Sequence, residues 1–149
     1  MQWHGWSWTN FPVPEAHLIV GAFGVGLGLI WPLTWATEGP WPWFIGLALG
    51  MVGVGLMVWA TASAGNVLLA DPTQLVTEGP YAISRHPMYL GWTLLYLGLM
   101  VVSGSAWLLM LLPILATWIH WESGREEQRM TERFGNRYIE YQSSVRRYL

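Results

Sequence analysis

Long stretches without a charged side chain constrain this chain more than any other feature of its sequence. Residues Ala16 to Thr37 contain no Asp, Glu, Lys or Arg, and neither do Gly39 to Ala70 or His86 to Trp121. A helix needs about 20 such residues to cross about 30 Å of hydrocarbon. Only 11% of the residues are charged, whereas a soluble domain has roughly a quarter. The sequence therefore predicts an all-α integral membrane protein.

The three stretches predict four transmembrane helices. The first helix is expected over Ala16 to Thr37, and the second over Trp43 to Ala64 with an interfacial extension toward Asp71. The last stretch is interrupted at residues 103–105, Ser-Gly-Ser. We therefore expect the third and fourth helices to form a tight hairpin that ends near Trp121.

The remaining residues form polar ends of a single membrane domain. Gly135 and Asn136 predict a break between two short helices in the C-terminal tail, which is too charged to span a bilayer. The predicted parts are an interfacial N-terminus at 1–15, the first two helices at 16–70, the motif loop and hairpin at 71–121, and the tail at 122–149.

The charges indicate both the topology and the partners. Four spans place the N-terminus, the loop before the third helix and the tail on one side, and all seven basic residues, every one an arginine, fall on that side. Basic loops stay cytoplasmic, so we expect this side to face the cytoplasm. A net charge of −2 gives no basic surface for nucleic acid. Four scattered histidines and no cysteine indicate no metal site.

Small residues are spaced to bring helices together. Gly24 with Gly28 and Gly46 with Gly50 each place two glycines on one helical face, where the backbones of neighbouring helices can approach. We interpret both pairs as packing contacts and assign them no ligand.

Two polar strings carry the residues suited to chemistry. The first, EGPYAISRHPMYLG, runs from Glu78 to Gly91, and its Pro87 suits the start of a helix. The positive end of that helix favours an anionic group near Arg85, Tyr81 and Tyr89. Spacing alone fits a second interpretation equally well, in which Arg85 anchors the loop to a lipid phosphate.

The second string, REEQRMTERFGNRYIEYQ, lies in the tail. Glu126 and Glu127 begin an apolar stripe that would lie on the membrane or against the helix bundle. Carboxylates beside an apolar bundle are costly unless a cation or hydrogen-bond donor meets them. A solvated pairing with Arg129 or Arg133 is the alternative. The stripe consists of Met130, Phe134, Tyr138, Tyr141, Val145 and Tyr148.

Together the two strings resemble the isoprenylcysteine carboxyl methyltransferase family and the related phospholipid N-methyltransferases. The resemblance rests on GPYAISRHPMYLG before the hairpin and on EEQRM followed by FGNRYIEY after it, in the family's order. It covers about half of the chain, from Leu75 onward, while the first two helices match only as hydrophobic spans.

The resemblance implies methyl transfer from S-adenosylmethionine to a lipophilic or membrane-accessible small acceptor. It implies catalytic roles for Glu126 and Glu127, which would orient a substrate or receive a proton, and for Arg85, which would pair with the cofactor carboxylate. The cofactor ammonium and sulfonium would then supply the positive charge that the glutamates need. The implied cofactor-binding residues are Tyr81, Arg85, His86, Pro87, Tyr89, Gly91, Glu126 and Glu127.

The chain departs from the family where substrate choice is concerned. Family tails often carry basic residues at the positions of Glu122 and Ser144, and the basic end survives here as the pair Arg146 and Arg147. An amine, a thiol or a lipid headgroup is therefore as possible an acceptor as a carboxylate. Two other functions remain open. One is an NADPH-dependent membrane reductase related to sterol reductases, and the other is a non-catalytic module that binds membrane lipids.

Overall fold

The fold is all-helical over the described part of the chain. The computed structural model describes residues 15–35, 38–65 and 73–149, and within them the only strand-like feature is an isolated bridge between Thr34 and Ser105. The helices, in chain order, are α1 Glu15–Ile30, α2 Trp41–Ala64, the 3₁₀ turn η2 Gly79–Ala82, α3 Pro87–Ser103, α4 Ala106–Phe134 and α5 Asn136–Ser144.

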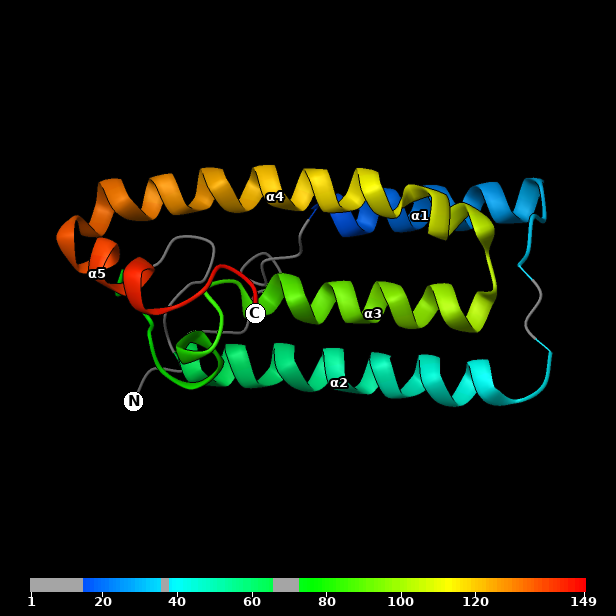
Figure 1. Cartoon of the computed structure of the whole chain (residues 1–149), viewed down its shortest axis with the longest axis horizontal. Coiled ribbons are helices and arrows are strands. Elements are labelled where there is room, and N and C mark those ends of the chain that lie inside the picture. Colours follow the sequence, from blue (N-terminus) through cyan, green and yellow to red (C-terminus); the bar gives the residue numbers. More distant parts are fainter. Residues whose placement is uncertain (1–14, 36–37, 66–72) are drawn as a thin grey trace, which may run out of the picture.

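The four long helices form two antiparallel pairs that lie side by side (Figure 1). Helix α2 packs closely along α3, and α1 packs along α4, whereas contacts between the two pairs are sparser. The end of α2, the start of α3, the end of α4 and α5 gather at one end of the molecule, on the left of Figure 1. All seven arginines belong to the segments at this end.

The first helix is shorter than the sequence predicted. Helix α1 ends at Ile30 because Pro32 disfavours the helical conformation of the residue before it. The chain then runs extended beside the hairpin turn, where the Leu33 carbonyl accepts a hydrogen bond from the Ala106 amide at 2.9 Å. The predicted end at Thr37 lies outside the described residues.

The second helix and the turn between the third and fourth helices were predicted correctly. Helix α2 starts at Trp41, two residues before the expected Trp43, because a proline fits the first helical turn. Its predicted extension toward Asp71 reaches residues outside the described part. The hairpin turns at Gly104, whose φ of 59° is a left-handed conformation that glycine adopts without strain.

The fourth helix is much longer than expected. Helix α4 does not end near Trp121 but continues to Phe134, so the first half of the predicted tail extends this helix beyond the bundle. The predicted break is confirmed, because α4 stops before Gly135, which has a φ of 57°, and α5 begins at Asn136.

Two glycine pairs hold α2 against α3. A Cβ atom on Gly53 would lie 2.5 Å from the carbonyl oxygen of Gly91, and one on Gly98 would lie 2.6 Å from that of Gly46. Seven residues separate the glycines on each helix, so both contacts fall on one face. Gly46 and Gly50 were correctly predicted to pack, because a Cβ on Gly98 would also lie 3.1 Å from the amide nitrogen of Gly50, and Gly53 continues the same face.

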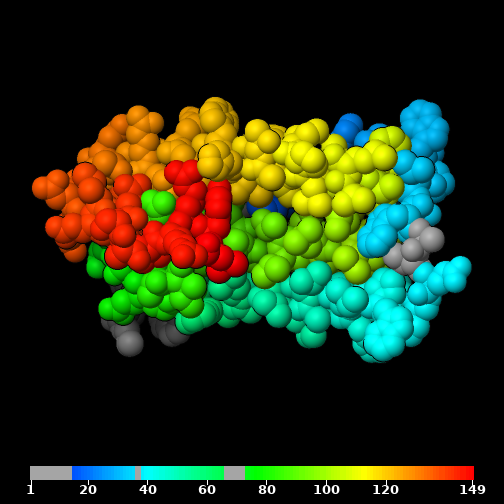
Figure 2. All heavy atoms as spheres, in the orientation of Figure 1, coloured from blue at the N-terminus to red at the C-terminus, as the bar shows by residue number. Residues whose placement is uncertain are grey.

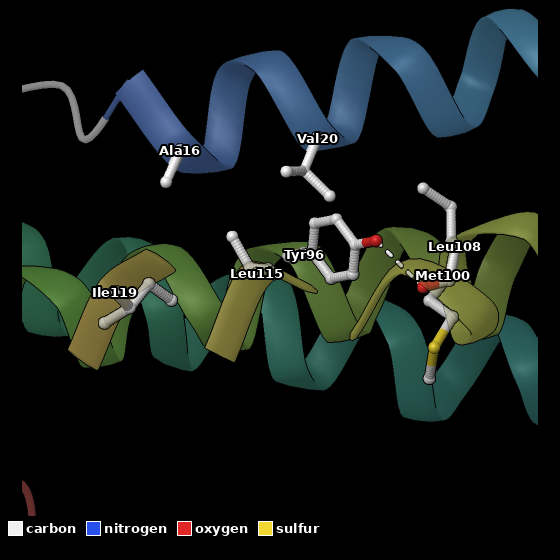
Figure 3. Packing of buried hydrophobic residues seen from close by; sticks show 7 residues of the cluster. All are labelled: Ala16, Val20, Tyr96, Met100, Leu108, Leu115 and Ile119. Atoms are coloured by element: carbon white, nitrogen blue, oxygen red, sulfur yellow. Dashed lines mark hydrogen bonds between the residues drawn. The ribbon is translucent and has the colours of Figure 1, made fainter. Parts of the chain in front are cut away.

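A hydrophobic core lies between the two helix pairs. Tyr96 of α3 is 4% exposed, and its hydroxyl donates a 2.8 Å hydrogen bond to the carbonyl of Leu108, which tethers α3 to α4 (Figure 3). The apolar side chains of this cluster are Ala16, Val20, Tyr96, Met100, Leu108, Leu115 and Ile119.

Among the described helices, only α2 meets the length and composition expected of a membrane span. It has 24 residues, whereas α1 and α3 are apolar but shorter, with 16 and 17 residues. Four spans therefore remain a prediction.

The glycine contacts lead to a prediction for stability. We expect Gly53→Val to destabilise the protein by about 1–3 kcal/mol, because the new side chain would push against the α3 backbone. Gly55→Val is the matched control, since no atom lies within 4 Å of a Cβ placed there. Thermal unfolding in detergent measures both variants, and equal melting temperatures would contradict the role of Gly53.

Candidate functional site

The motif loop folds into a short 3₁₀ turn that packs against the tail. Gly79 has a φ of 62° and lies against the side chain of Ser63, where a larger residue would not fit. The buried Tyr81 follows, and its carbonyl accepts a 2.6 Å hydrogen bond from the Tyr141 hydroxyl of α5. The loop is therefore fixed to α5 before it reaches Arg85.

Arg85 and His86 meet the two tail glutamates. The Nη1 atom of Arg85 lies 3.3 Å from Oε1 of Glu127. The Nε2 atom of His86 lies 3.2 Å from the same oxygen, and its Nδ1 atom lies 3.5 Å from Oε2 of Glu126. The two strings of the sequence thus come together in one ionic cluster.

Arg147, near the C-terminus, is the closest partner of Glu127. Its Nε donates to Oε1 at 2.9 Å and its Nη2 to Oε2 at 2.6 Å, a bidentate pair. The expectation that a cofactor supplies the cations for Glu127 was therefore wrong, because Arg85 and Arg147 already do so. The sequence did not predict this partner, although Arg146 and Arg147 form a basic pair close to the last residue, Leu149.

His86 is held between two carboxylates. Both ring nitrogens face a glutamate oxygen, an arrangement that suits the imidazolium, in which both nitrogens are donors. Burial opposes the charge, but the hydrogen bonds and charges of Glu126 and Glu127 outweigh it and raise the pKa of His86 above its ordinary value.

Glu127 is ionised although it is buried. Burial opposes ionisation, but the hydrogen bonds from His86 and Arg147, with the charges of Arg85 and Arg147, lower its pKa to about 2. Two arginines and His86 therefore face the two carboxylates in the cluster. The Nε atom of Arg85 is buried and has no hydrogen-bond partner, so one donor of the cluster remains unused.

The last residues of the chain fasten the motif loop to α4. The Arg85 amide donates to the Arg146 carbonyl at 3.0 Å, and the Ser84 hydroxyl donates to the Arg147 carbonyl at 3.1 Å. The Tyr148 hydroxyl lies 3.2 Å from the hydroxyl of Ser123 on α4. In Figure 2 this C-terminal segment, drawn in red, lies across the face between the motif loop and α4.

The other predicted site residues have different surroundings. Pro87 is buried in the first turn of α3 as expected, and the Tyr89 ring packs edge-on against His86 with centroids 5.5 Å apart. Gly91 was predicted to line a cofactor pocket, but it lies against Gly53 and Met57 of α2. Its small size serves the contact between the two helices.

The apolar stripe of the tail packs against the bundle in part. Tyr138 and Tyr141 are buried, with 2% and 8% of their surfaces exposed. Met130, Phe134, Val145 and Tyr148 are half-buried. The sequence allowed this stripe to lie on the membrane or against the helix bundle. The two tyrosines of α5 are buried inside the protein, and Tyr141 contacts the motif loop through its hydrogen bond to Tyr81.

Comparisons with known proteins identify the family. The sequence model described as "Phospholipid methyltransferase" matches residues 41–137, which is more than half of the chain. The chain therefore belongs to the phospholipid methyltransferase family. The match includes the first polar string and the second as far as Arg137, and it leaves out α1 and the C-terminal segment with Arg147.

A similar relative carries a methyltransferase name. Protein-S-isoprenylcysteine O-methyltransferase of Xenopus laevis is 31% identical in an alignment of 114 residues that covers 70% of this chain and 39% of that protein. The chain thus spans 39% of the relative's length. No solved structure matches the chain.

The pKa of Glu127 predicts how stability depends on pH. A depressed carboxyl pKa stabilises the fold above the unfolded-state value and loses this effect as the pH falls toward the folded value. We expect the wild-type melting temperature in detergent to fall between pH 4.5 and about 2. Glu127→Gln should melt lower at neutral pH and lose less stability across that window.

Glu132→Gln serves as the control, because Glu132 is an exposed carboxylate on the same helix. Its acid transition should match that of the wild type. An unchanged transition in Glu127→Gln would show that the ion cluster does not stabilise the fold.

Proposed function

We propose that the protein is an integral membrane methyltransferase that uses S-adenosylmethionine and methylates a lipophilic acceptor. The observation that carries the proposal is the convergence of Arg85 and His86 with Glu126 and Glu127, since all four lie in the part of the chain that matches the family. The acceptor would be a carboxylate, an amine or a thiol that reaches the site from the membrane.

The exposed surface supports a location in the membrane. Helices α1 and α2 turn large apolar side chains outward, including Leu29 at 83% exposed and Met51 at 70%. A soluble monomer rarely exposes contiguous apolar area of this kind. We propose that α1, α2, α3 and the apolar half of α4 all span the bilayer, with the arginine-bearing end in the cytoplasm.

The ion cluster fits parts of the cofactor. The unused Nε donor of Arg85 suits the amino-acid carboxylate of the cofactor. Glu126 keeps a third of its side chain exposed and suits the cofactor ammonium. When bound, S-adenosylmethionine would supply a methyl group on a sulfonium that is reactive toward nucleophiles.

The residues of the chain would act mainly by positioning. Direct methyl displacement needs no covalent enzyme intermediate. Holding the reactants in line and excluding water would therefore account for most of the rate enhancement over the uncatalysed reaction. Arg85 and Glu126 would bind the cofactor ends. His86, held from both sides by carboxylates, would keep Glu126 oriented, and Glu127 would hold the loop and the C-terminal segment together.

Calorimetry on the purified protein in detergent tests the proposal. We expect binding of S-adenosylmethionine and of its demethylated product, and no binding of NADPH. Binding of NADPH alone would indicate a membrane reductase, and absence of all three would favour a non-catalytic lipid-binding module.

Substitutions at the cofactor-facing positions give a second test. Arg85→Gln and Glu126→Gln should each weaken S-adenosylmethionine binding by about tenfold or more, the effect of losing a hydrogen bond to a charged group. Arg137→Gln is the control, because this exposed arginine lies on α5 outside the cluster. Equal affinities in all three variants would refute the assignment of the cofactor site.

A further inference from the structure

Two arginines share one buried carboxylate, and they do so unequally. Glu127 accepts two hydrogen bonds from Arg147, at 2.9 Å from Nε and 2.6 Å from Nη2. Arg85 reaches the same carboxylate only through Nη1, which lies 3.3 Å from Oε1. A charge-assisted hydrogen bond is typically about 2.7–2.9 Å long. Arg147 is therefore the principal partner of Glu127, and Arg85 is a more loosely held second cation.

The acceptor sites of Glu127 explain this difference. Each carboxylate oxygen offers about two acceptor sites. The Oε1 atom already faces Nε of Arg147 at 2.9 Å and Nε2 of His86 at 3.2 Å, and Oε2 faces Nη2 of Arg147. Arg147 thus occupies the edge of the carboxylate that a second guanidinium would need for a bidentate pair. The Nε atom of Arg85 is left without a hydrogen-bond partner, in a side chain only 12% exposed.

The backbone holds both arginines within reach of Glu127. The Arg85 amide donates to the Arg146 carbonyl, and the Ser84 hydroxyl donates to the Arg147 carbonyl. Both acceptors are main-chain atoms, so these bonds do not require the Arg147 side chain. Buried polar atoms are nearly always hydrogen-bonded. If the Arg147 side chain were shortened, Oε2 of Glu127 would lose its partner, and the unpaired donor of Arg85 would turn to the carboxylate.

We propose that Arg147 is a positioning residue for the cofactor, because by occupying both oxygens of Glu127 it keeps Nε of Arg85 free to bind the amino-acid carboxylate of S-adenosylmethionine. This inference rests on the proposed function. Without Arg147, Arg85 pairs with Glu127 and is no longer available to the cofactor. Arg147 lies outside the segment that matches the family, residues 41–137, so this role concerns the present chain.

Two ligands measure the contact between Arg85 and the cofactor carboxylate. Decarboxylated S-adenosylmethionine keeps the sulfonium and the ammonium but has no carboxylate. In calorimetry on the wild type in detergent, its dissociation constant should be about tenfold or more above that of S-adenosylmethionine, the effect of losing a hydrogen bond to a charged group. In Arg147→Gln the two ligands should bind equally, because S-adenosylmethionine binds more weakly and the decarboxylated ligand is unaffected.

The ratio of the two dissociation constants separates positioning from a merely structural role. If Arg147 only supported the fold, Arg147→Gln would weaken both ligands by the same factor and leave the ratio unchanged, and this result would overturn the inference. Arg146→Gln is the matched control, because it removes the same charge from the exposed neighbouring side chain. It should keep the wild-type ratio.

Two further variants keep the test decisive if Arg147→Gln does not fold. Arg147→Lys retains the charge beside Glu127, but an ammonium is a point charge that cannot cover both oxygens. Its ratio should fall below that of the wild type. Glu127→Gln combined with Arg147→Gln removes the carboxylate that attracts Arg85, so the ratio should return to the wild-type value although the melting temperature is lower. A wild-type ratio in Arg147→Lys, or equal binding of the two ligands by the double variant, would contradict the inference.

Nitrogen-15 spectra of arginine-labelled protein give a readout without cofactor. The Nε–H signal of Arg85 is assigned by its loss in Arg85→Gln. It should shift in ligand-free Arg147→Gln, where Nε pairs with Glu127, and return in the double variant. An unshifted signal would overturn the inference even if S-adenosylmethionine binds. A shifted signal in a protein that does not bind S-adenosylmethionine would refute the proposed function and leave the release of Arg85 by Arg147 in place.

Discussion

The pairing of Glu127 with Arg147 and Arg85 holds together the end of the molecule where the motif loop, α5 and the C-terminal segment gather. Glu127 stands on the extension of α4, Arg85 on the motif loop and Arg147 on the C-terminal segment. An ion pair that is buried must be well matched, because each charge has lost its hydration. The bidentate contact of Arg147 meets that requirement. The hydrogen bonds of the Ser84 hydroxyl and the Arg85 amide to the same segment then follow from its position.

The helix bundle provides the rigid base for this cluster. Glycine contacts bring α2 and α3 close together, so the start of α3, with Pro87 and the motif loop before it, is fixed relative to α2. Helix α4 carries Glu126 and Glu127 beyond the apolar core on the same continuous helix that packs along α1.

Several features of the fold followed from local sequence, and several did not. Charge-free length predicted α2 and the hairpin, and the glycine at 135 predicted the end of α4. The predicted first helix was too long, because its apolar residues continue past Pro32 although this proline ends the helix at Ile30. The continuation of α4 past Trp121 was missed because a change from apolar to charged residues marks a change of surroundings, and it does not by itself end a helix.

The sequence by itself determined that the chain is largely apolar and helical, where its long helices begin, and which two polar strings would face one another. These properties depend on composition and on spacing within a few residues. Only the tertiary structure decided that Gly91 faces α2, that Arg147 neutralises Glu127 and that Arg85 has an unpaired nitrogen. Each of these involves side chains far apart in the chain, and their distances depend on how the helices pack, which no local pattern encodes.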